Sequence, residues 1–222
     1  MNLTIYKKKR NFQETQEPAG KIKTGTPALS FVVHRHKASH LHYDFRLEME
    51  GVLKSWAVPK GPSMNPGDKR LAMMVEDHPY DYKDFEGVIP EGNYGAGIVE
   101  IWDRGFYTDT ENSDKKTTEK KLLADLKKGS LKFTLHGKKL KGDFALVKIR
   151  GRQENAWLLI KHRDEFATEE EYNSESQTLA NSPINKLLQQ ELSEKTPARM
   201  DHFVAKKTRT KKSSTSNPEK KK

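Results

Sequence analysis

The clearest pattern in the chain is the strict alternation of apolar and polar residues from Leu41 to Glu50. A period of two is that of a β-strand with one buried face. Other short runs of β-branched and aromatic residues predict seven further strands. The eight predicted strands cover residues 31–34, 41–50, 52–58, 71–76, 98–103, 130–136, 143–149 and 156–161. Many short strands with few helices indicate a mainly β fold. We expect a compact antiparallel β-barrel with a few short peripheral helices and disordered basic ends.

Three short helices are predicted outside the strands. One contains a cluster of leucines and ends at Gly129, and a second covers Glu169–Tyr172. The third begins at Ser182, where a serine N-cap is followed by Pro183 at the first helical position. Thr108–Lys121 is charged and has no apolar pattern, which predicts a surface loop.

The positive charge is concentrated at the two ends of the chain. The formal net charge is +10, of which residues 206–222 carry +7 and residues 1–23 carry +4, so the middle is close to neutral. Basic arms favour a polyanion such as nucleic acid, although a tail that only improves solubility is the alternative. Hydrophobic residues make up 33% of the chain and the mean hydropathy is −0.92, which indicates that part of the chain is unpacked.

The composition also limits the compartment and the chemistry. The sequence has no cysteine, which excludes disulfides and thiolate metal sites. It has neither an apolar run long enough to span a bilayer nor a secretory signal pattern at its start. We therefore expect no membrane partner and a cytoplasmic, nucleoid-associated location.

Candidate metal ligands lie on the alternating strand. His42, Asp44 and Arg46 fall on its polar face, about 6.6 Å apart from neighbour to neighbour. Together with His36 they offer imidazole and carboxylate ligands for a divalent metal such as manganese, iron or zinc. An arginine beside such a metal suits a phosphate. The alternative is an ordinary strand whose polar face meets water.

A second group of polar residues follows between positions 56 and 97. Lys60 stands at a Pro/Gly bend, Arg70 begins the next predicted strand, and Glu76, His78 and Tyr82 come soon after. A glycine-dense run completes the segment, and it suits either close approach to a ligand or a plain tight turn. Cations and a histidine beside a metal would serve phosphate chemistry, although a lone histidine is more often structural.

Four blocks of the sequence occur in order at residues 31–47, 51–63, 75–82 and 85–97. These blocks closely resemble the 3′-phosphoesterase domain of bacterial DNA ligase D. The similarity runs from about Tyr6 to about Phe166, and the domain also occurs as a free-standing protein. The resemblance implies a β-barrel with a manganese site on one side, where Co²⁺ or Zn²⁺ could also serve. It implies removal of a 3′-terminal ribonucleotide and then of the 3′-phosphate, leaving a 3′-hydroxyl for non-homologous end joining.

The resemblance also implies a role for each matching residue. His36, His42 and Asp44 correspond to the metal ligands, and His78 would donate a proton or stabilise the transition state. One departure is visible, because the family usually has an acid where this chain has Asn11, so its ribonucleotide-removing activity is in doubt. The other implied residues are Arg46 and Arg70 at the phosphate, Tyr82 beside His78, and Glu17, Lys60 and Glu76 as support.

From this resemblance we expect four segments: a basic arm packed on the barrel (1–28), the barrel (29–166), a helical extension (167–205) and a Lys-rich tail (206–222). The expected substrates are DNA 3′ ends, as primer–templates with a 3′-ribonucleotide or a 3′-phosphate. A DNA ligase and other end-joining proteins would be separate partners. Two alternatives stay open: a non-haem iron oxygenase that uses the His/His/Asp set, and a non-catalytic factor that binds DNA ends.

Overall fold

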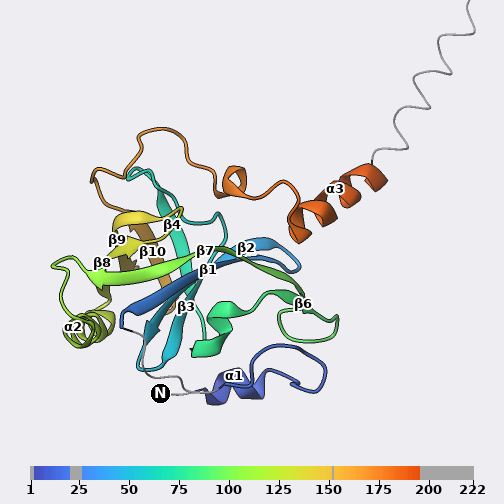
Figure 1. Ribbon diagram of the computed structural model, residues 1–222, viewed down its shortest axis with the longest axis horizontal. Coiled ribbons are helices and arrows are strands. Elements are labelled where there is room, and N and C mark those ends of the chain that lie inside the picture. Colours follow the sequence, from blue (N-terminus) through green and yellow to red (C-terminus); the bar gives the residue numbers. More distant parts are fainter. Residues whose placement is uncertain (1–2, 21–26, 152, 196–222) are drawn as a thin grey trace, which may run out of the picture. The chain divides into compact units, whose positions relative to one another are not determined.

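The computed structural model describes residues 3–20, 27–151 and 153–195 (Figure 1). The chain divides into two compact units, Met1–Leu179 and Ala180–Lys222. In the second unit the structure describes one helix, α3 (Pro183–Lys195), and the Ser182 hydroxyl accepts a hydrogen bond from the Asn185 N–H at 3.2 Å. The predicted start of this helix is confirmed. The Lys-rich tail at 206–222 lies outside the described residues.

The first unit is a closed antiparallel β-barrel of eight strands (Figure 1). Its order is β1-β2-β3-β4-β10-β9-β8-β7, and pairing of β1 with β7 closes the circle. Each of the eight predicted strands corresponds to one barrel strand, so the predicted fold class is confirmed. The barrel strands are β1 (Leu29–Lys37), β2 (Leu41–Met49), β3 (Val52–Val58), β4 (Lys69–Met74), β7 (Gly97–Asp109), β8 (Ser130–His136), β9 (Lys141–Lys148) and β10 (Ala156–Lys161).

Alternation along the strands separates an apolar interior from an outer face. Phe31 and Val33 of β1 and Phe45 and Leu47 of β2 are buried in the cluster that fills the barrel. The residues between them point to the other side of the wall, because successive side chains of a strand face opposite ways. The polar face of β2 therefore lies on the outside of the barrel.

A small outer layer covers this part of the wall. It consists of α1 (Thr4–Lys8), β5 (His78–Pro79), the 3₁₀ helix η1 (Tyr80–Asp84) and β6 (Gly87–Ile89). Tyr6 of α1 and Tyr82 of η1 pack in a second apolar cluster with Val32 and Leu53 from the outer faces of β1 and β3. The polar side chains of β2 are thus held between the barrel wall and this layer rather than in bulk water.

The segment after β10 packs against one end of the barrel. The 3₁₀ helix η2 (Ser174–Gln177) places Glu175 against Arg35, whose side chain is fully buried (Nη2 to Oε2, 2.5 Å). The Tyr43 hydroxyl also donates to Glu175, and the Trp102 indole donates to the Ser174 carbonyl at 3.1 Å. These residues belong to the same compact unit as the barrel.

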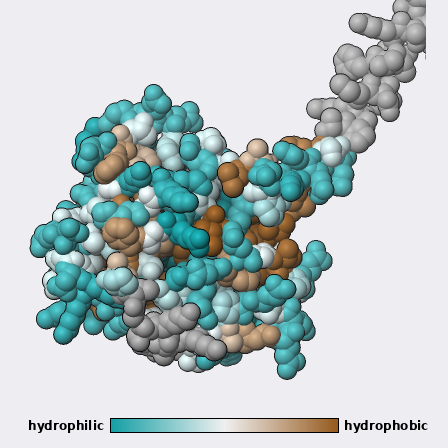
Figure 2. Space-filling view, in the orientation of Figure 1, coloured by the Kyte–Doolittle hydropathy of each residue, from teal (hydrophilic) through white to brown (hydrophobic). Residues whose placement is uncertain are grey.

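Two predicted elements were wrong. Thr108–Lys121 is not a loop, because β7 continues to Asp109 and α2 (Lys115–Lys128) begins where the Asp114 carboxylate caps the N–H groups of Lys116 and Thr117. The helix stays on the surface, and Figure 2 shows mainly hydrophilic side chains over it. Residues 169–172 form no helix, and the turn that does form is η2. In addition, the arm contains the short helix α1, which was not predicted.

The end of helix α2 agrees with the sequence signal. Helix α2 ends at Gly129, as predicted, and this residue has a left-handed φ of 82° that favours glycine. Among the helices that the structure describes, none is both long enough and apolar enough to cross a membrane.

Candidate metal centre and phosphate pocket

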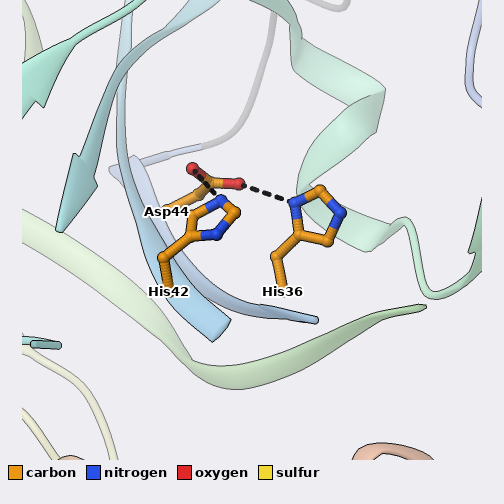
Figure 3. Close-up of side chains that lie close together, drawn as sticks. All are labelled: His36, His42 and Asp44. Carbon is orange, nitrogen blue, oxygen red and sulfur yellow. Dashed lines mark ion pairs between the residues drawn. The ribbon is translucent and has the colours of Figure 1, made fainter. Parts of the chain in front are cut away.

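Three potential metal ligands meet on the outer face of β1 and β2. His36 lies directly opposite His42 in the antiparallel pair, and Asp44 follows two residues later on the same face. Their ligand atoms all lie within 4.8 Å of one another. Figure 3 shows the Asp44 carboxylate between the two rings, with His42 Nε2 at 3.7 Å and His36 Nδ1 at 3.8 Å from its oxygens. The register of the two strands therefore brings together the three residues predicted as metal ligands.

Backbone carbonyls fix the protonation of both rings. The His36 Nε2 atom lies 2.9 Å from the Gly95 carbonyl, and the His42 Nδ1 atom lies 3.0 Å from the His40 carbonyl. A carbonyl only accepts, so each of these nitrogens carries the proton. The two lone pairs that remain, on His36 Nδ1 and His42 Nε2, are those that face Asp44. Outer contacts of this kind orient the histidine ligands of metal sites.

The Asp44 carboxylate is held in its ionised form. Burial on its own would raise the pKa of Asp44, but the adjacent Arg46 guanidinium lowers it well below the usual range. The Arg46 Nη2 atom donates to Asp44 at 3.1 Å. The site therefore offers one carboxylate and two imidazole ligands, which is a donor set that suits divalent manganese, iron or zinc.

Arg46 is buried and held at all three of its nitrogens. Besides Asp44, it donates from Nη1 to the Ser55 hydroxyl at 2.8 Å and from Nε to His34 Nδ1 at 3.3 Å. Burial, and after it the positive charge of Arg46, lowers the pKa of His34 to about 3. The ring therefore stays neutral and accepts the hydrogen bond from Arg46. The Arg46 guanidinium also lies 4.9 Å from the centre of the Tyr82 ring. His34 and Ser55 had no predicted role, because only the register of the strands shows that they surround Arg46.

The N-terminal arm contributes an arginine that the sequence analysis did not include. The Arg10 Nη2 atom lies 3.1 Å from His78 Nε2, and Arg10 Nε donates to Glu17 at 2.8 Å. Tyr82 donates its hydroxyl to the same Glu17 oxygen at 3.1 Å. Nothing local in the sequence indicates that the packing of the arm brings the side chain of Arg10 to His78, which is 68 residues away along the chain.

His78 is neutral and accepts a hydrogen bond at its Nε2 atom. Because arginine only donates and the Glu76 carbonyl only accepts, its proton lies on Nδ1, 2.9 Å from that carbonyl. Burial, followed by the charges of Arg46 and Arg10, lowers the pKa of His78 well below its ordinary value. In this state the ring presents a lone pair, whereas a proton donor would need Nε2 protonated.

The three metal-ligand candidates line one cavity of about 210 Å³ together with Arg46, Arg10 and His78. Counted at their formal charges, its two arginines and three carboxylates give the cavity one net negative charge. The pKa of Glu76 is lowered, because contacts with its own N–H, Lys9 and Arg10 outweigh its burial. A divalent cation would reverse the net sign and allow the cavity to accept a phosphate. The charged residues are Arg10, Arg46, Glu17, Asp44 and Glu76.

Two residues predicted for the active site, Arg70 at the phosphate and Lys60 as support, lie elsewhere. Lys60 and Arg70 line a different cavity, of about 360 Å³, next to residues 171–175. Arg70 shares the strand face of Ala72, which points into the barrel, and it donates to Asp68 and to the Tyr172 carbonyl, both at 2.7 Å. The structure does not bring these two residues to the metal centre, and their roles stay predictions.

Asn11 also stays apart from the centre. Its side chain is exposed, and its amide oxygen accepts a hydrogen bond from the Gln13 N–H at 3.2 Å. It does not line the cavity of the metal centre. The substitution noted in the sequence therefore affects a turn of the arm, while the neighbouring Arg10 reaches the site.

Comparison with known proteins places this site in a family. Residues 34–148, which include the three ligand candidates and His78, match the family described as the DNA ligase D 3′-phosphoesterase domain. The chain belongs to that family. The match covers the β1–β9 part of the barrel with its outer layer, apart from the N-terminal arm that supplies Arg10.

Curated relatives agree with this assignment. The chain is 49% identical over 166 residues to the multifunctional non-homologous end joining protein LigD of Pseudomonas aeruginosa. It is 41% identical over 165 residues to the LigD protein of Mycolicibacterium smegmatis and 42% identical over 167 residues to that of Mycobacterium tuberculosis. Each match covers 73% of this chain but only 19–21% of the relative. The chain therefore spans about a fifth of the length of these relatives.

Proposed function

We propose that this protein is a manganese-dependent 3′-phosphoesterase that prepares DNA ends for non-homologous end joining. It would remove a 3′-terminal ribonucleotide by phosphodiester cleavage and then the 3′-phosphate, leaving a 3′-hydroxyl. The observation that carries the proposal is the convergence of His36, His42 and Asp44 beside Arg46, within the part of the chain that matches the phosphoesterase family. The names of the relatives support the role in end joining.

His36, His42 and Asp44 would hold the metal. The fit is supported by the two free nitrogen lone pairs that face the ionised carboxylate. A bound divalent ion polarises phosphoryl oxygens and neutralises developing negative charge. The donor set also suits Co²⁺ or Zn²⁺, so manganese is taken from the family resemblance and not from the geometry.

Arg46, Arg10 and His78 would act on the phosphate. Arg46 is fixed by three hydrogen bonds, so little rearrangement is needed when a substrate arrives. Arg10 donates to His78 and to Glu17 and can turn one of these donors toward a phosphate oxygen. Once Arg10 turns, His78 Nε2 is available to accept a proton or a hydrogen bond at the scissile phosphate, and Tyr82 would stay beside it.

Glu17 offers a means of recognising a ribonucleotide. Its Oε1 atom accepts from Arg10 and Tyr82, whereas Oε2 is buried without a hydrogen-bond partner among the described residues. A ribose 2′-hydroxyl is a donor that such an oxygen accepts. This contact does not depend on Asn11, so we propose that ribonucleotide removal survives the departure from the family pattern.

The two alternative functions are less well supported. A non-haem iron oxygenase would use the same two histidines and one carboxylate. However, the buried arginines that adjoin the ligands suit a phosphate, and the family match is to a phosphoesterase. A factor that only binds DNA ends would not need the neutral, correctly oriented imidazoles described above.

The experiment uses a labelled primer–template that ends in one ribonucleotide, and a second that ends in a 3′-phosphate. With Mn²⁺, the full chain should convert both to a 3′-hydroxyl product on a gel, and EDTA should stop both conversions. Asp44→Ala and His42→Ala should abolish both activities while circular dichroism shows a folded protein. His40→Ala is the matched control, because this exposed histidine lines neither cavity described above. Wild-type rates for Asp44→Ala at saturating Mn²⁺ would overturn the metal assignment.

A further inference from the structure

The metal cavity has an exposed aromatic ring on its lining. Tyr94 is 49% exposed, yet it belongs to the residues that line the same cavity as His36, His42 and Asp44. Most other large aromatic side chains of this region, such as Tyr80, Tyr82 and Phe85, are buried. A half-exposed tyrosine beside a charged pocket presents a flat apolar surface to whatever enters that pocket.

The loop that carries Tyr94 is fixed next to the metal ligands. The following residue, Gly95, accepts the His36 N–H at 2.9 Å, and adjacent Cα atoms are about 3.8 Å apart. Two turns hold the loop, from Asn93 N–H to the Pro90 carbonyl at 3.3 Å and from Ala96 N–H to the Asn93 carbonyl at 3.1 Å. Gly97 anchors its end, because a Cβ there would lie 2.2 Å from the Lys37 carbonyl oxygen.

Two cations adjoin the ring. Lys9 Nζ donates to the Tyr94 hydroxyl at 3.1 Å and lies 4.4 Å from the ring centre, and the Arg10 guanidinium lies 5.6 Å from it. A flat aromatic ring beside cations is the combination that proteins use for single-stranded nucleic acid, where bases stack on the ring and cations follow the backbone. Stacking is tolerant of sequence, because every base has a π-face.

We propose that Tyr94 is the platform on which the terminal nucleobase of the DNA end stacks while its phosphate lies at the metal centre. The proposal depends on the proposed phosphoesterase function and adds the subsite that binds the nucleoside. Arg10, Arg46 and the metal would bind only the phosphate, which is common to every phosphate ester. Tyr94 would thus distinguish a nucleotide end from other phosphate esters without choosing among the four bases.

The test combines a change in the protein with a change in the substrate. The full chain, Tyr94→Ala and Tyr94→Phe are compared on a 3′-phosphate primer–template whose last nucleoside has its base or is abasic. Stacking is worth about 1–3 kcal/mol per base, so Tyr94→Ala should lower kcat/KM about 5- to 150-fold on the normal end. On the abasic end the same substitution should have almost no effect. Tyr94→Phe keeps the ring and should stay near wild type on both ends.

The controls separate stacking from a structural role. Phe106 is also exposed, at 46%, but it stacks on His136 and lies outside the cavity, so Phe106→Ala should change neither substrate. Binding of Mn²⁺ by calorimetry should be the same for Tyr94→Ala and wild type. An equal loss on normal and abasic ends, or weaker Mn²⁺ binding, would overturn the proposal, because Tyr94 would then act by holding the Gly95 carbonyl.

A binding measurement keeps this inference distinct from the proposed function. Fluorescence anisotropy with the same two oligonucleotides, in EDTA and in Mn²⁺, compares affinities without any hydrolysis. If wild-type protein cleaves neither substrate, the phosphoesterase proposal fails, while a base-dependent difference between wild type and Tyr94→Ala would still support stacking. If cleavage occurs but affinity and rate are the same with and without the terminal base, only the stacking proposal fails.

Discussion

Replacing Arg46 with lysine tests whether the shape of this cation matters as well as its charge. Arginine donates in several directions from one plane, and here its three nitrogens contact His34, Ser55 and Asp44 at 2.8–3.3 Å. The single ammonium group of lysine can stay beside Asp44 but cannot also reach the other two partners in that geometry. Arg46→Lys therefore preserves the charge and removes two of the three hydrogen bonds.

The contacts give a magnitude for this change. A hydrogen bond that involves a charged group contributes about 1.5–3 kcal/mol, so two lost bonds amount to about 3–6 kcal/mol. If the transition state is destabilised by the lower value, about 3 kcal/mol, kcat/KM falls at least about 100-fold, because each 1.36 kcal/mol is a factor of ten. A similar loss of folding free energy, about 3 kcal/mol, would lower Tm by about 6–12 °C for a chain of this size.

Metal binding should respond differently. Lysine keeps a positive charge next to the ionised Asp44, so the Mn²⁺ affinity of Arg46→Lys should fall by no more than about tenfold. Arg46→Ala leaves that carboxylate without its partner, and loss of such an outer contact weakens metal binding about 10- to 100-fold. The measurements are steady-state hydrolysis of a 3′-phosphate primer, calorimetric Mn²⁺ titration and a thermal melt for each variant.

Arg104→Lys is the matched control for these experiments. The Arg104 side chain is 62% exposed and its contact with Asp84 is 3.5 Å, so the same exchange there should leave rate, metal affinity and Tm near wild type. If Arg46→Lys retains kcat/KM within about threefold of wild type, the planar arrangement of donors is not what the phosphate requires, and the reasoning from geometry is refuted.

Further predictions concern stability, the second cavity and the tail. Burial would raise the pKa of Asp109, but hydrogen bonds from Ser113 and Lys121 lower it. This carboxylate therefore stabilises the fold above its unfolded pKa, about 3.9, and the benefit is lost as the pH falls through the lower folded value. Asp109→Asn should accordingly melt below wild type at pH 7, with a Tm difference that narrows below about pH 4. Arg70→Lys should leave Mn²⁺ affinity at the wild-type value, since Arg70 lies apart from the metal cavity, and weaker Mn²⁺ binding in calorimetry would contradict this. Deleting residues 206–222 should make the dependence of log Kd for duplex DNA on log salt shallower by about 0.9 per lost phosphate contact, with kcat unchanged, and an unchanged slope would show that the tail does not bind DNA.

The strands could be predicted because each one follows a local rule. In β2 the alternation identifies the strand, its buried face and the neighbouring positions of His42 and Asp44. Only the second half of helix α2 was predicted, because its first half is polar and its start depends on the Asp114 cap rather than on an apolar stripe. The short strands β5 and β6 were not predicted, since two or three residues are too few to show any period.

From the residue pattern alone, without the family resemblance, the site was predictable only where it follows one strand pair. His36 and His42 flank the β1–β2 hairpin, so their proximity follows from antiparallel pairing. By contrast, Arg10 reaches His78 through the packing of the arm on the barrel. Arg70 was expected beside Arg46 at the phosphate. Its side chain lies instead on the face of β4 that points into the barrel, and sequence alone does not give the register between β3 and β4.

The contact between η2 and Arg35 decides how far the domain can be shortened. The family match ends at residue 148, and a cut after the last barrel strand, at 166, would still keep every strand. Such a fragment would lack Glu175 and leave the guanidinium of Arg35 with Glu100 as its remaining carboxylate partner inside the barrel end. Removing Glu175 takes away one of the carboxylates that compensate this buried charge, which lowers the stability of the fold. The smallest autonomous unit therefore extends to about Leu179, and transplanting this domain into another protein requires that its last turn come with it.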